Sequence, residues 1–600
     1  MAERKGAEII ADHLVREHVP YVVALCGHGN LGLLDALYDR RGEIRTISVH
    51  HESVAGFVAD AYHRIRHEPI STLTSCGPGS ANLPIALGSA FMDGSAFLAI
   101  TGNVPTSQFN RGPFQETGRY YQADFPSVLR PYVKRSFQAT RAEQLPLMLR
   151  QAFALMRQGR PGPVHLDVPL DVFVERATTS EEQVRDAPGV SLHAAARAEE
   201  IDELLDRVLA ATRPVVVAGY GVENAGGTEE LRAFVRAAGL PLVTSPLGKA
   251  VADPGSPLSL GASGRNGTYQ ANRATRSADV VLALGTRFDD RATSSWLPGY
   301  TYRIPPTTLL QVDLEPEALG RNYPVTVGLA ANPRDALQQL REGLERRRQQ
   351  GDERARPDSP CRRRWLADIA TWRERWEEHV APHRTQDGTP LRPERVLHDL
   401  RRALPTEGIL VADVGVHHNW IVQEWRPGGP GTLLQSWGFA SMGFGVAGVL
   451  GARLAAPARP VLAVVGDGGF LMHPSAVATA VEHGLPAVWL VWNNGGYISI
   501  RDQQVGYFGA GRELATSFRQ ETDGTPYAID FAAMARSMGA RGIRVGCAAD
   551  LGEALEDAVS SEQPTVLDVP VDASVSLPAA ASWDLPPLPH PEPTFGWPDR

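Results

Sequence analysis

Short apolar runs alternate with helical patterns over residues 1–178. Residues 21–26, 97–102 and 164–169 are apolar runs of strand length, whereas residues 53–62 carry the small side chains of a closely packed helix face. Strands that alternate with helices pair in parallel, because each crossover helix returns the chain to the same edge of the sheet. We therefore predict a parallel, doubly wound sheet for this first unit.

The same alternation occurs twice more along the chain. The further strands that we expect are residues 214–221, 278–285, 309–314, 408–413, 461–465 and 487–492. A chain of 600 residues also exceeds what one hydrophobic core organises. The predicted fold class is therefore α/β, with three doubly wound parallel-sheet domains.

Polar and proline-rich stretches separate the three units. Residues 177–195 are polar and interrupt the alternation, and the charged, proline-containing stretch after residue 346 does the same, so both are interpreted as linkers. The proline-rich C-terminal stretch should be extended. The expected boundaries are a first domain 1–178, a central domain 196–346, a linker 347–388, a third domain 389–576 and a proline-rich tail 577–600.

Composition is that of an ordinary globular protein, with 43% hydrophobic and 21% charged residues and a net charge of −9. This balance gives no reason to expect nucleic acid or an anionic membrane as a partner. No apolar run approaches the ~20 residues of a membrane span. The cysteines are scattered without zinc spacing, which favours a reduced, cytoplasmic protein; they are Cys26, Cys76, Cys361 and Cys547.

Two polar segments follow neighbouring apolar runs in the third unit. Residues 461–465 lead into Gly466-Asp467-Gly468, and the next predicted strand leads into Asn493-Asn494. Glycines beside Asp467 let backbone N–H groups approach an anion at the carboxyl ends of parallel strands, where ligands bind. The 27 residues from Asp467 to Asn494 allow one crossover helix. A carboxylate, an amide oxygen and a nearby carbonyl suit Mg²⁺ with phosphate oxygens.

At this spacing the segment resembles the thiamine diphosphate signature of the acetolactate synthase-like enzymes, the family of the acetohydroxyacid synthase large subunits. The resemblance implies that Asp467, Asn494 and the Gly496 carbonyl hold Mg²⁺. The three domains would then be pyrimidine-binding, central and diphosphate-binding. The residues that the resemblance assigns to the cofactor are Gly77, Pro78, Asn82, Val414, Gly415, Val416, His417, Ala440, Met442, Gly468, Gly469, Tyr497 and Ile498.

Glu52 stands between a predicted strand, residues 44–49, and the small-residue helix. By itself, a glutamate in a helix's first turn is most often a solvated partner of the helix dipole. The family's activating glutamate has a similar His-Glu context, so the resemblance implies that Glu52 hydrogen-bonds the pyrimidine and starts deprotonation of the thiazolium C2. In this family the glutamate and the diphosphate site lie on different subunits, which implies a homo-oligomer, at least a dimer.

Met442 and Gln115 complete the set that the resemblance implies. Methionine is often a filler of core gaps, but Met442 lies in a run similar to the family's Gly-x-Met-Gly-x-Gly, which props the cofactor in a bent form. Gln115 lies in Phe114-Gln115-Glu116, which is similar to the family's Phe-Gln-Glu element. The glutamine of that element faces the reacting carbonyl.

Several segments depart from the biosynthetic synthases. The stretch around Gln503 lacks their tryptophan, and Ser263-Gly-Arg-Asn-Gly267 replaces their flavin-contacting Gly-Met-His-Gly, which puts bound FAD in doubt. The loop Gly27-His28-Gly29-Asn30 resembles instead the thiamine enzymes that hydrolyse cyclic 1,2-diones. His28 would then serve as a general acid–base; the alternative is a loop histidine bonded to backbone.

Two main functional hypotheses follow from these residues. The first is a carboligase that decarboxylates a pyruvate-like 2-oxo acid and joins the product to a second carbonyl, as an acetolactate synthase does. The second is a C–C hydrolase of a cyclic 1,2-dione, favoured by His28 and the missing tryptophan. Simple decarboxylation to an aldehyde also stays open. A catalytically silent subunit is disfavoured, because the activating glutamate and the metal-site residues are all present.

Overall fold

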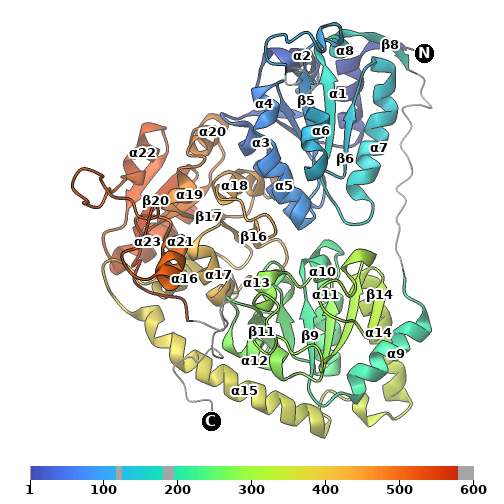
Figure 1. Ribbon diagram of the computed structural model, residues 1–600, viewed down its shortest axis with the longest axis vertical. Coiled ribbons are helices and arrows are strands. Elements are labelled where there is room, and N and C mark those ends of the chain that lie inside the picture. The colour runs from blue at the N-terminus through green and yellow to red at the C-terminus, as the bar shows by residue number, and fades with distance from the viewer. Residues whose placement is uncertain (1, 117–124, 180–194, 579–600) are drawn as a thin grey trace.

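The computed structural model describes residues 2–116, 125–179 and 195–578. Three six-stranded sheets, each built of parallel strands, form three α/β units (Figure 1). The predicted fold class is thus confirmed. Within the described ranges, no helix combines the length and the apolar character needed to cross a membrane.

The N-terminal unit is a doubly wound sheet with the strand order β3-β2-β4-β5-β7-β6. Its strands are β2 (Tyr21–Ala24), β3 (Arg45–Ser48), β4 (Ser71–Thr74), β5 (Leu98–Asn103), β6 (Arg135–Gln138) and β7 (Val164–Pro169). The helices are α1 (Gly6–Arg16), α2 (Leu31–Asp39), α3 (Glu52–Arg66), α4 (Pro78–Ala81), α5 (Pro84–Asp93), α6 (Phe125–Leu129), α7 (Leu145–Arg157) and α8 (Leu170–Val174). A separate antiparallel pair joins β1 (Ala2–Lys5) to β8 (Arg176–Thr179).

The central unit has the strand order β11-β10-β9-β12-β13-β14. Its strands are β9 (Pro214–Ala218), β10 (Leu242–Thr244), β11 (Ser259–Ala262), β12 (Val280–Leu284), β13 (Thr308–Asp313) and β14 (Val327–Ala330). The helices are α9 (Ala198–Ala210), α10 (Tyr220–Asn224), α11 (Thr228–Ala238), α12 (Tyr269–Ser277), α13 (Asp290–Thr293) and α14 (Pro333–Gln349). The winding direction reverses between β9 and β12, as in other doubly wound sheets.

The C-terminal unit has the strand order β16-β15-β17-β18-β20-β19. Its strands are β15 (Ile409–Ala412), β16 (Leu433–Gln435), β17 (Val461–Gly466), β18 (Val488–Asn493), β19 (Arg541–Arg544) and β20 (Thr565–Pro570). The helices are α16 (Pro393–Ala403), α17 (Val416–Glu424), α18 (Phe444–Ala455), α19 (Asp467–Phe470), α20 (Ser475–His483), α21 (Ile498–Phe508), α22 (Phe531–Ser537) and α23 (Ala548–Ser560).

The segment 347–388, expected as a solvated linker, instead contains the long helix α15 (Pro360–Val380). Trp365 and Ile369 of α15 are buried in a core cluster of the central unit. The helix runs along the lower edge of the molecule from the central unit toward the C-terminal unit (Figure 1). Most of the linker expected at 177–195 and of the tail expected at 577–600 lies outside the described residues, and the domain boundaries remain predictions.

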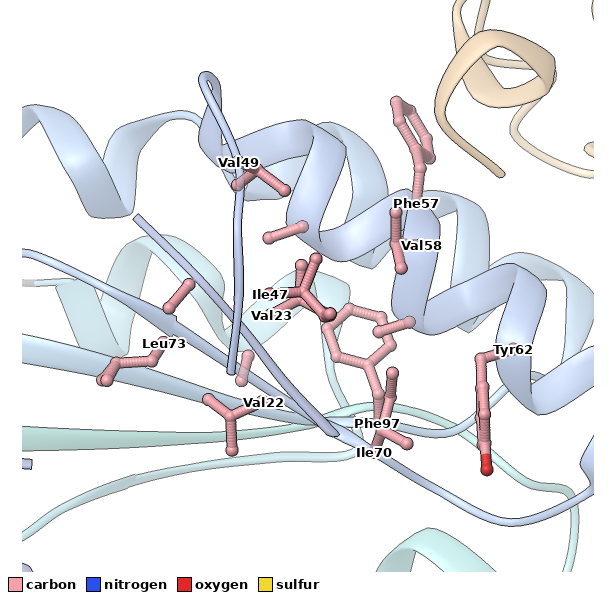
Figure 2. Packing of buried hydrophobic residues seen from close by; sticks show 14 of the residues in the cluster. Val22, Val23, Ile47, Val49, Phe57, Val58, Tyr62, Ile70, Leu73 and Phe97 are labelled. Carbon is pink, nitrogen blue, oxygen red and sulfur yellow. The ribbon is translucent and has the colours of Figure 1, made fainter. Parts of the chain in front are cut away.

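Helices α3 and α18 join the N-terminal and C-terminal units into one hydrophobic core. Figure 2 shows α3 lying over the N-terminal sheet, with Val58 on the side of the helix toward the sheet, while Phe57 points toward the C-terminal unit. There Phe57 meets Phe444 of α18 edge to face, at 5.9 Å between ring centroids. A Cβ on Gly451 of α18 would overlap the backbone of α3. The small side chains predicted for residues 53–62 therefore serve close helix packing.

A buried ionic cluster lies beside this helix pair. Arg64, only 1% exposed, donates to both carboxylate oxygens of Asp60 at 2.7 and 3.1 Å and to the Gln435 carbonyl at 2.5 Å. It also forms an ion pair of 3.3 Å with Asp93, which is paired in turn with Arg287 of the central unit. All three units thus meet at one group of buried charges.

Replacing Arg64 by methionine should destabilise the protein by about 3–5 kcal/mol, because Asp60 and Asp93 would stay buried without their cation. Denaturant unfolding followed by tryptophan fluorescence measures the loss. The matched control is Arg66→Met, since Arg66 lies on the same helix with a half-exposed side chain. Equal stability of the Arg64 and Arg66 variants would show that the cluster is not a structural centre.

Glu223 of α10 makes another contact between units, because its Oε1 accepts the Gly431 N–H at 2.9 Å. Burial raises the pKa of Glu223 to about 7. A carboxyl whose pKa is higher in the folded state favours folding when protonated, so its contribution is full below the unfolded pKa and is lost as the pH rises to about 7.

Glu223→Gln should therefore gain stability over the native protein as the pH rises from 5 to 8, by about 2–3 kcal/mol in all. Thermal unfolding of both proteins across this pH range measures the difference. A difference that does not change with pH would remove Glu223 from this role.

Candidate active site

The carboxyl ends of three neighbouring strands carry polar side chains in the C-terminal unit. Strand β17 pairs with β15 on one side and with β18 on the other. Asp413 follows β15, Asp467 follows the last residue of β17, and Asn494 follows β18. The predicted neighbourhood of Asp467 and Asn494 is thus present in the fold.

The Asp467 carboxylate organises the loop after β18. Its Oδ2 accepts the backbone N–H groups of Asn494, Gly495 and Gly496 at 3.1, 2.7 and 3.0 Å, and its Oδ1 accepts that of Gly468 at 2.7 Å. Burial raises the pKa of Asp467 to about 6 despite these bonds. A nearby cation would lower that pKa again, because it favours the ionised form.

His417 is fully enclosed at the start of α17. Its ring packs against two glycines. A Cβ added to Gly415 would lie 2.7 Å from the ring atom Cε1, and a Cβ added to Gly466 would lie 3.1 Å from the same atom. Its Nε2 is buried without a hydrogen-bond partner among the described residues. Burial lowers the pKa of His417 to about 3, so the ring is neutral near pH 7. A buried polar atom without a protein partner is available to a bound water or ligand.

A cavity connects these groups. It is lined by Arg291 of the central unit and by C-terminal residues that include most of the sequence-predicted cofactor contacts: Val414, Gly415, Val416, His417, Ala440, Met442, Asp467, Gly468, Gly469, Asn494, Gly496, Tyr497 and Ile498. The Tyr497 ring packs directly against Gly468, where a Cβ would overlap it. Among the described residues, no group of three or more His, Cys, Asp or Glu side chains could hold a metal ion.

Sequence reasoning gave Asp413 no role, although it directly follows a buried strand, as Asp467 does. Asp413 is completely buried and accepts the backbone N–H groups of Gly443 and Gly445, both at 3.1 Å. It therefore fixes the turn that follows Met442. The missed signal was an acidic residue directly after an apolar run and directly before Val414-Gly415.

A second set of polar side chains lies at the carboxyl edge of the N-terminal sheet. Glu52 follows β3, His28 follows β2, and the loop with Cys76 follows β4; Gln115 lies in the segment after β5. These four strands are consecutive neighbours in the sheet. Residues far apart in sequence thus reach one edge.

Glu52 begins α3, and its carboxylate faces the turn after β4. Asn82 Nδ2 donates to Glu52 Oε2 at 2.9 Å, and a Cβ on Gly79 would lie 3.3 Å from Oε1. Gly77 has φ +57°, and Pro78 begins α4. The predicted residues Gly77, Pro78 and Asn82 therefore form the turn that supports Glu52.

The predicted residues His28 and Gln115 are brought together through Cys76. His28 Nε2 lies 3.5 Å from the Cys76 sulfur, and the thiol donates to Gln115 Oε1 at 3.7 Å. The exposed His28 ring also stacks on Phe114 at 5.9 Å between centroids. Among the described residues the hydrogen-bond contact of the His28 ring is to this thiol, and a general acid–base role for His28 stays a prediction.

The cavity described above lies at the carboxyl edge of the C-terminal sheet. His28, Glu52 and Gln115 are absent from the residues that line the cavity described above. Phe114 is 79% exposed at the N-terminal edge, whereas Phe439, 43% exposed, lies beside Tyr132 of the N-terminal unit at 6.3 Å between ring centroids. We call the polar side chains at the N-terminal edge the N-terminal half-site and those around the cavity the C-terminal half-site.

Models of three thiamine pyrophosphate enzyme domains match this chain. The N-terminal TPP binding domain matches residues 4–123, the central domain residues 201–340, and the C-terminal TPP binding domain residues 413–569. The probable acetolactate synthase large subunit of Methanocaldococcus jannaschii is 30% identical over 586 residues, covering 96% of this chain and 93% of the relative. The chain belongs to the acetolactate synthase-like family of thiamine pyrophosphate enzymes.

Other members of this acetolactate synthase-like family are equally similar in extent. The acetolactate synthase isozyme 3 large subunit of Escherichia coli is 30% identical over 581 residues, which is 95% of each chain. An acetolactate synthase of Mycobacterium bovis is 29% identical over 573 residues, covering 95% of this chain and 89% of the relative. The similarity therefore extends over all three units, and the predicted family is confirmed.

The thiamine diphosphate of this family fits the C-terminal half-site. Among the described residues the buried His417 Nε2 lacks a hydrogen-bond partner, and the glycines at 415, 466, 468 and 469 line the cavity with backbone while the rings of His417 and Tyr497 and the Asp413 carboxylate pack against them. Arg291 adds a cation from the central unit, which favours a negatively charged ligand. Sequence reasoning missed Arg291, because nothing in the order of residues shows that α13 reaches the C-terminal unit.

Proposed function

We propose that this enzyme is a thiamine diphosphate- and Mg²⁺-dependent carboligase. It would decarboxylate a pyruvate-like 2-oxo acid and join the remaining acyl unit to a second carbonyl compound. The observation that carries the proposal is the C-terminal cavity, where Asp467 and the unpartnered Nε2 of His417 meet a glycine-lined floor. The relatives named acetolactate synthase support this reaction among those open to the family.

The proposed metal ligands are the Asp467 carboxylate, the Asn494 side-chain amide oxygen and the Gly496 carbonyl. All three groups border the cavity. Oxygen ligands of this kind suit Mg²⁺, which completes its octahedron with phosphate oxygens and water. The diphosphate would be held by the backbone of residues 414–416 and by His417, whose Nε2 has no hydrogen-bond partner among the described residues.

When bound, thiamine diphosphate supplies a carbon nucleophile and takes up the electron pair that remains after CO₂ leaves. In our proposal Glu52 holds the proton at the pyrimidine ring nitrogen, with Asn82 fixing its carboxylate at 2.9 Å. Met442, which lines the cavity, would support the cofactor, and Asp413 fixes the backbone after it.

Gln115 and His28 are proposed to face the carbonyl of the substrate. The Gln115 amide can donate to a carbonyl oxygen, and His28 can move a proton at the product oxygen. Both lie on the half-site that carries Glu52, so substrate recognition and cofactor activation come from the same edge of the N-terminal sheet.

The complete site is proposed to form between two copies of the chain. The N-terminal half-site of one copy would cover the C-terminal half-site of the other, which would bury the exposed rings of Phe114 and Phe439. A homo-oligomer of two or more copies is therefore part of the proposal. We also propose a cytoplasmic location, because all four cysteines are free.

A screen of 2-oxo acids and carbonyl acceptors, with product mass spectrometry and CO₂ detection, tests the function. Pyruvate should give CO₂ and acetolactate only when Mg²⁺ and thiamine diphosphate are added. CO₂ with a free aldehyde would show a simple decarboxylase. Opening of a cyclic 1,2-dione without CO₂ would show the hydrolase and overturn the carboligase. A flavin absorbance band in the purified protein would reveal bound FAD.

A further inference from the structure

The sulfur of Cys76 is the meeting point of three loops in the N-terminal half-site. His28 Nε2 lies 3.5 Å from it, the Ser75 hydroxyl donates to it at 3.8 Å, and its own thiol donates to Gln115 Oε1 at 3.7 Å. These distances suit hydrogen bonds that involve the large sulfur atom. Cys76 is itself only 1% exposed, so its sulfur contacts these groups from the buried side.

The convergence follows from the order of the strands. The Cys76 loop follows β4, which lies between β2 and β5 in the sheet. His28 follows β2, and Gln115 lies in the segment after β5. The thiol therefore occupies the central position between the two side chains that are proposed to face the substrate.

The surrounding backbone holds the sulfur in place. A Cβ on Gly29 would lie 2.8 Å from the Cys76 sulfur, and one on Gly77 would lie 2.6 Å from the Gln115 carbonyl oxygen. Gln115 itself has φ +63°, a left-handed conformation that non-glycine residues seldom adopt. Gly29 N–H also donates to the Ser75 hydroxyl at 3.2 Å. Packing thus fixes the three loops relative to one another.

We propose that Cys76 is a positioning residue for the substrate half-site: its thiol holds the amide oxygen of Gln115 and the ring of His28. The Gln115 amide group is then oriented with its NH₂ turned away from the sulfur, toward the substrate carbonyl. This inference rests on the proposed function, because it takes Gln115 and His28 as the residues that face the substrate.

The protons of this cluster can be assigned. Burial raises the pKa of the Cys76 thiol, which keeps it protonated at neutral pH. The thiol hydrogen goes to Gln115 Oε1, so the ring of His28 donates its Nε2–H to the sulfur. Nδ1 of His28 is then left as an acceptor on the exposed side of the ring. Cys76 thereby sets the tautomer of His28 as well as the orientation of Gln115.

Steady-state kinetics of the full-length enzyme with thiamine diphosphate and Mg²⁺ test the proposal. Cys76→Ala should lower kcat/KM by about three- to tenfold, the usual range for one lost hydrogen bond. Cys76→Ser should recover most of the loss, because its hydroxyl also donates. The matched control is Cys361→Ala, since Cys361 is an exposed cysteine on helix α15 and should change nothing.

A double-mutant cycle separates positioning from general damage to the fold. Because Cys76 acts partly through Gln115, Cys76→Ala should cost less activity in a Gln115→Ala enzyme than in the native enzyme. Fully additive losses, or a Cys76→Ala enzyme as active as the native one, would overturn the proposal. Should Cys76→Ala unfold, Cys76→Val fills the same space without a donor and replaces it in the cycle.

Exchange of the thiamine C2 proton, measured by NMR, distinguishes the two possible failures. It should be unchanged in every Cys76 variant, because Glu52 is untouched, and a fall would overturn the positioning role. If the native enzyme exchanges this proton but releases no CO₂ from any 2-oxo acid, the proposed function fails. The cycle is then measured on the substrate that the screen identifies, where the same criteria decide on Cys76.

Discussion

Glu52→Gln should bind thiamine diphosphate with native affinity and lose about 10²–10⁴-fold in turnover, the range for removal of a group that transfers a proton. Glutamine keeps the shape of the side chain and an oxygen that can accept from Asn82 Nδ2, so the turn after β4 should stay intact. It cannot act as the carboxylate that our proposal places at the pyrimidine. Exchange of the C2 proton, followed by NMR in deuterated water, measures the step directly.

The matched control is Glu68→Gln, because Glu68 lies just beyond α3 with an exposed carboxylate. Its exchange rate and turnover should equal those of the native enzyme. Native exchange in Glu52→Gln would remove Glu52 from the activating role. Loss of cofactor binding in that variant would instead make Glu52 a structural residue.

Asp467→Asn should weaken the binding of Mg²⁺ and thiamine diphosphate by at least about 100-fold. The substitution removes the negative charge that the proposed metal ligand supplies, while one oxygen remains to accept backbone N–H groups of residues 494–496. Without cofactor the fold should be at least as stable as before, because burial disfavours the ionised carboxylate. Calorimetric titration with thiamine diphosphate in excess Mg²⁺ gives the affinity.

Asp523→Asn serves as the matched control, since Asp523 is an exposed carboxylate of the same unit. It should leave the affinity unchanged. Native cofactor affinity in Asp467→Asn would show that the diphosphate is anchored elsewhere. Such a result would also remove Asn494 and Gly496 from the proposed metal site.

Much of the fold could be predicted from local pattern. Buried parallel strands are continuous apolar runs, so residues 164–169 and 461–465 were recognised as strands at nearly their observed bounds. Strand β4 (Ser71–Thr74) was not predicted, because its buried side chains are mainly hydroxyls. The sequence of helix α15 does not indicate a packed helix, since its buried Trp365 and Ile369 are spread among many charged residues.

The candidate site was predictable only where its residues follow two strands that are consecutive in the chain. Asp467 and Asn494 are separated by a single crossover, so their spacing placed them side by side. Cys76 approaches His28 and Gln115 across separations of 48 and 39 residues, which depend on the order of strands in the sheet. Arg291 reaches the cavity from another unit altogether. Contacts of this kind arise from tertiary packing and leave no periodic signal in the sequence.

Mixing two inactive variants tests directly whether a carboligase site forms between two copies of the chain. Glu52→Gln and Asp467→Asn are unfolded and refolded together, and acetolactate formation from pyruvate is measured. Each mixed dimer would contain one site built from an intact Glu52 half-site and an intact Asp467 half-site, and a second site built from the two altered half-sites. Since half of the dimers are mixed at equal mixing, activity should return to about a quarter of the native value. No recovery, although mixed dimers form and each native homodimer refolds fully, would contradict the account.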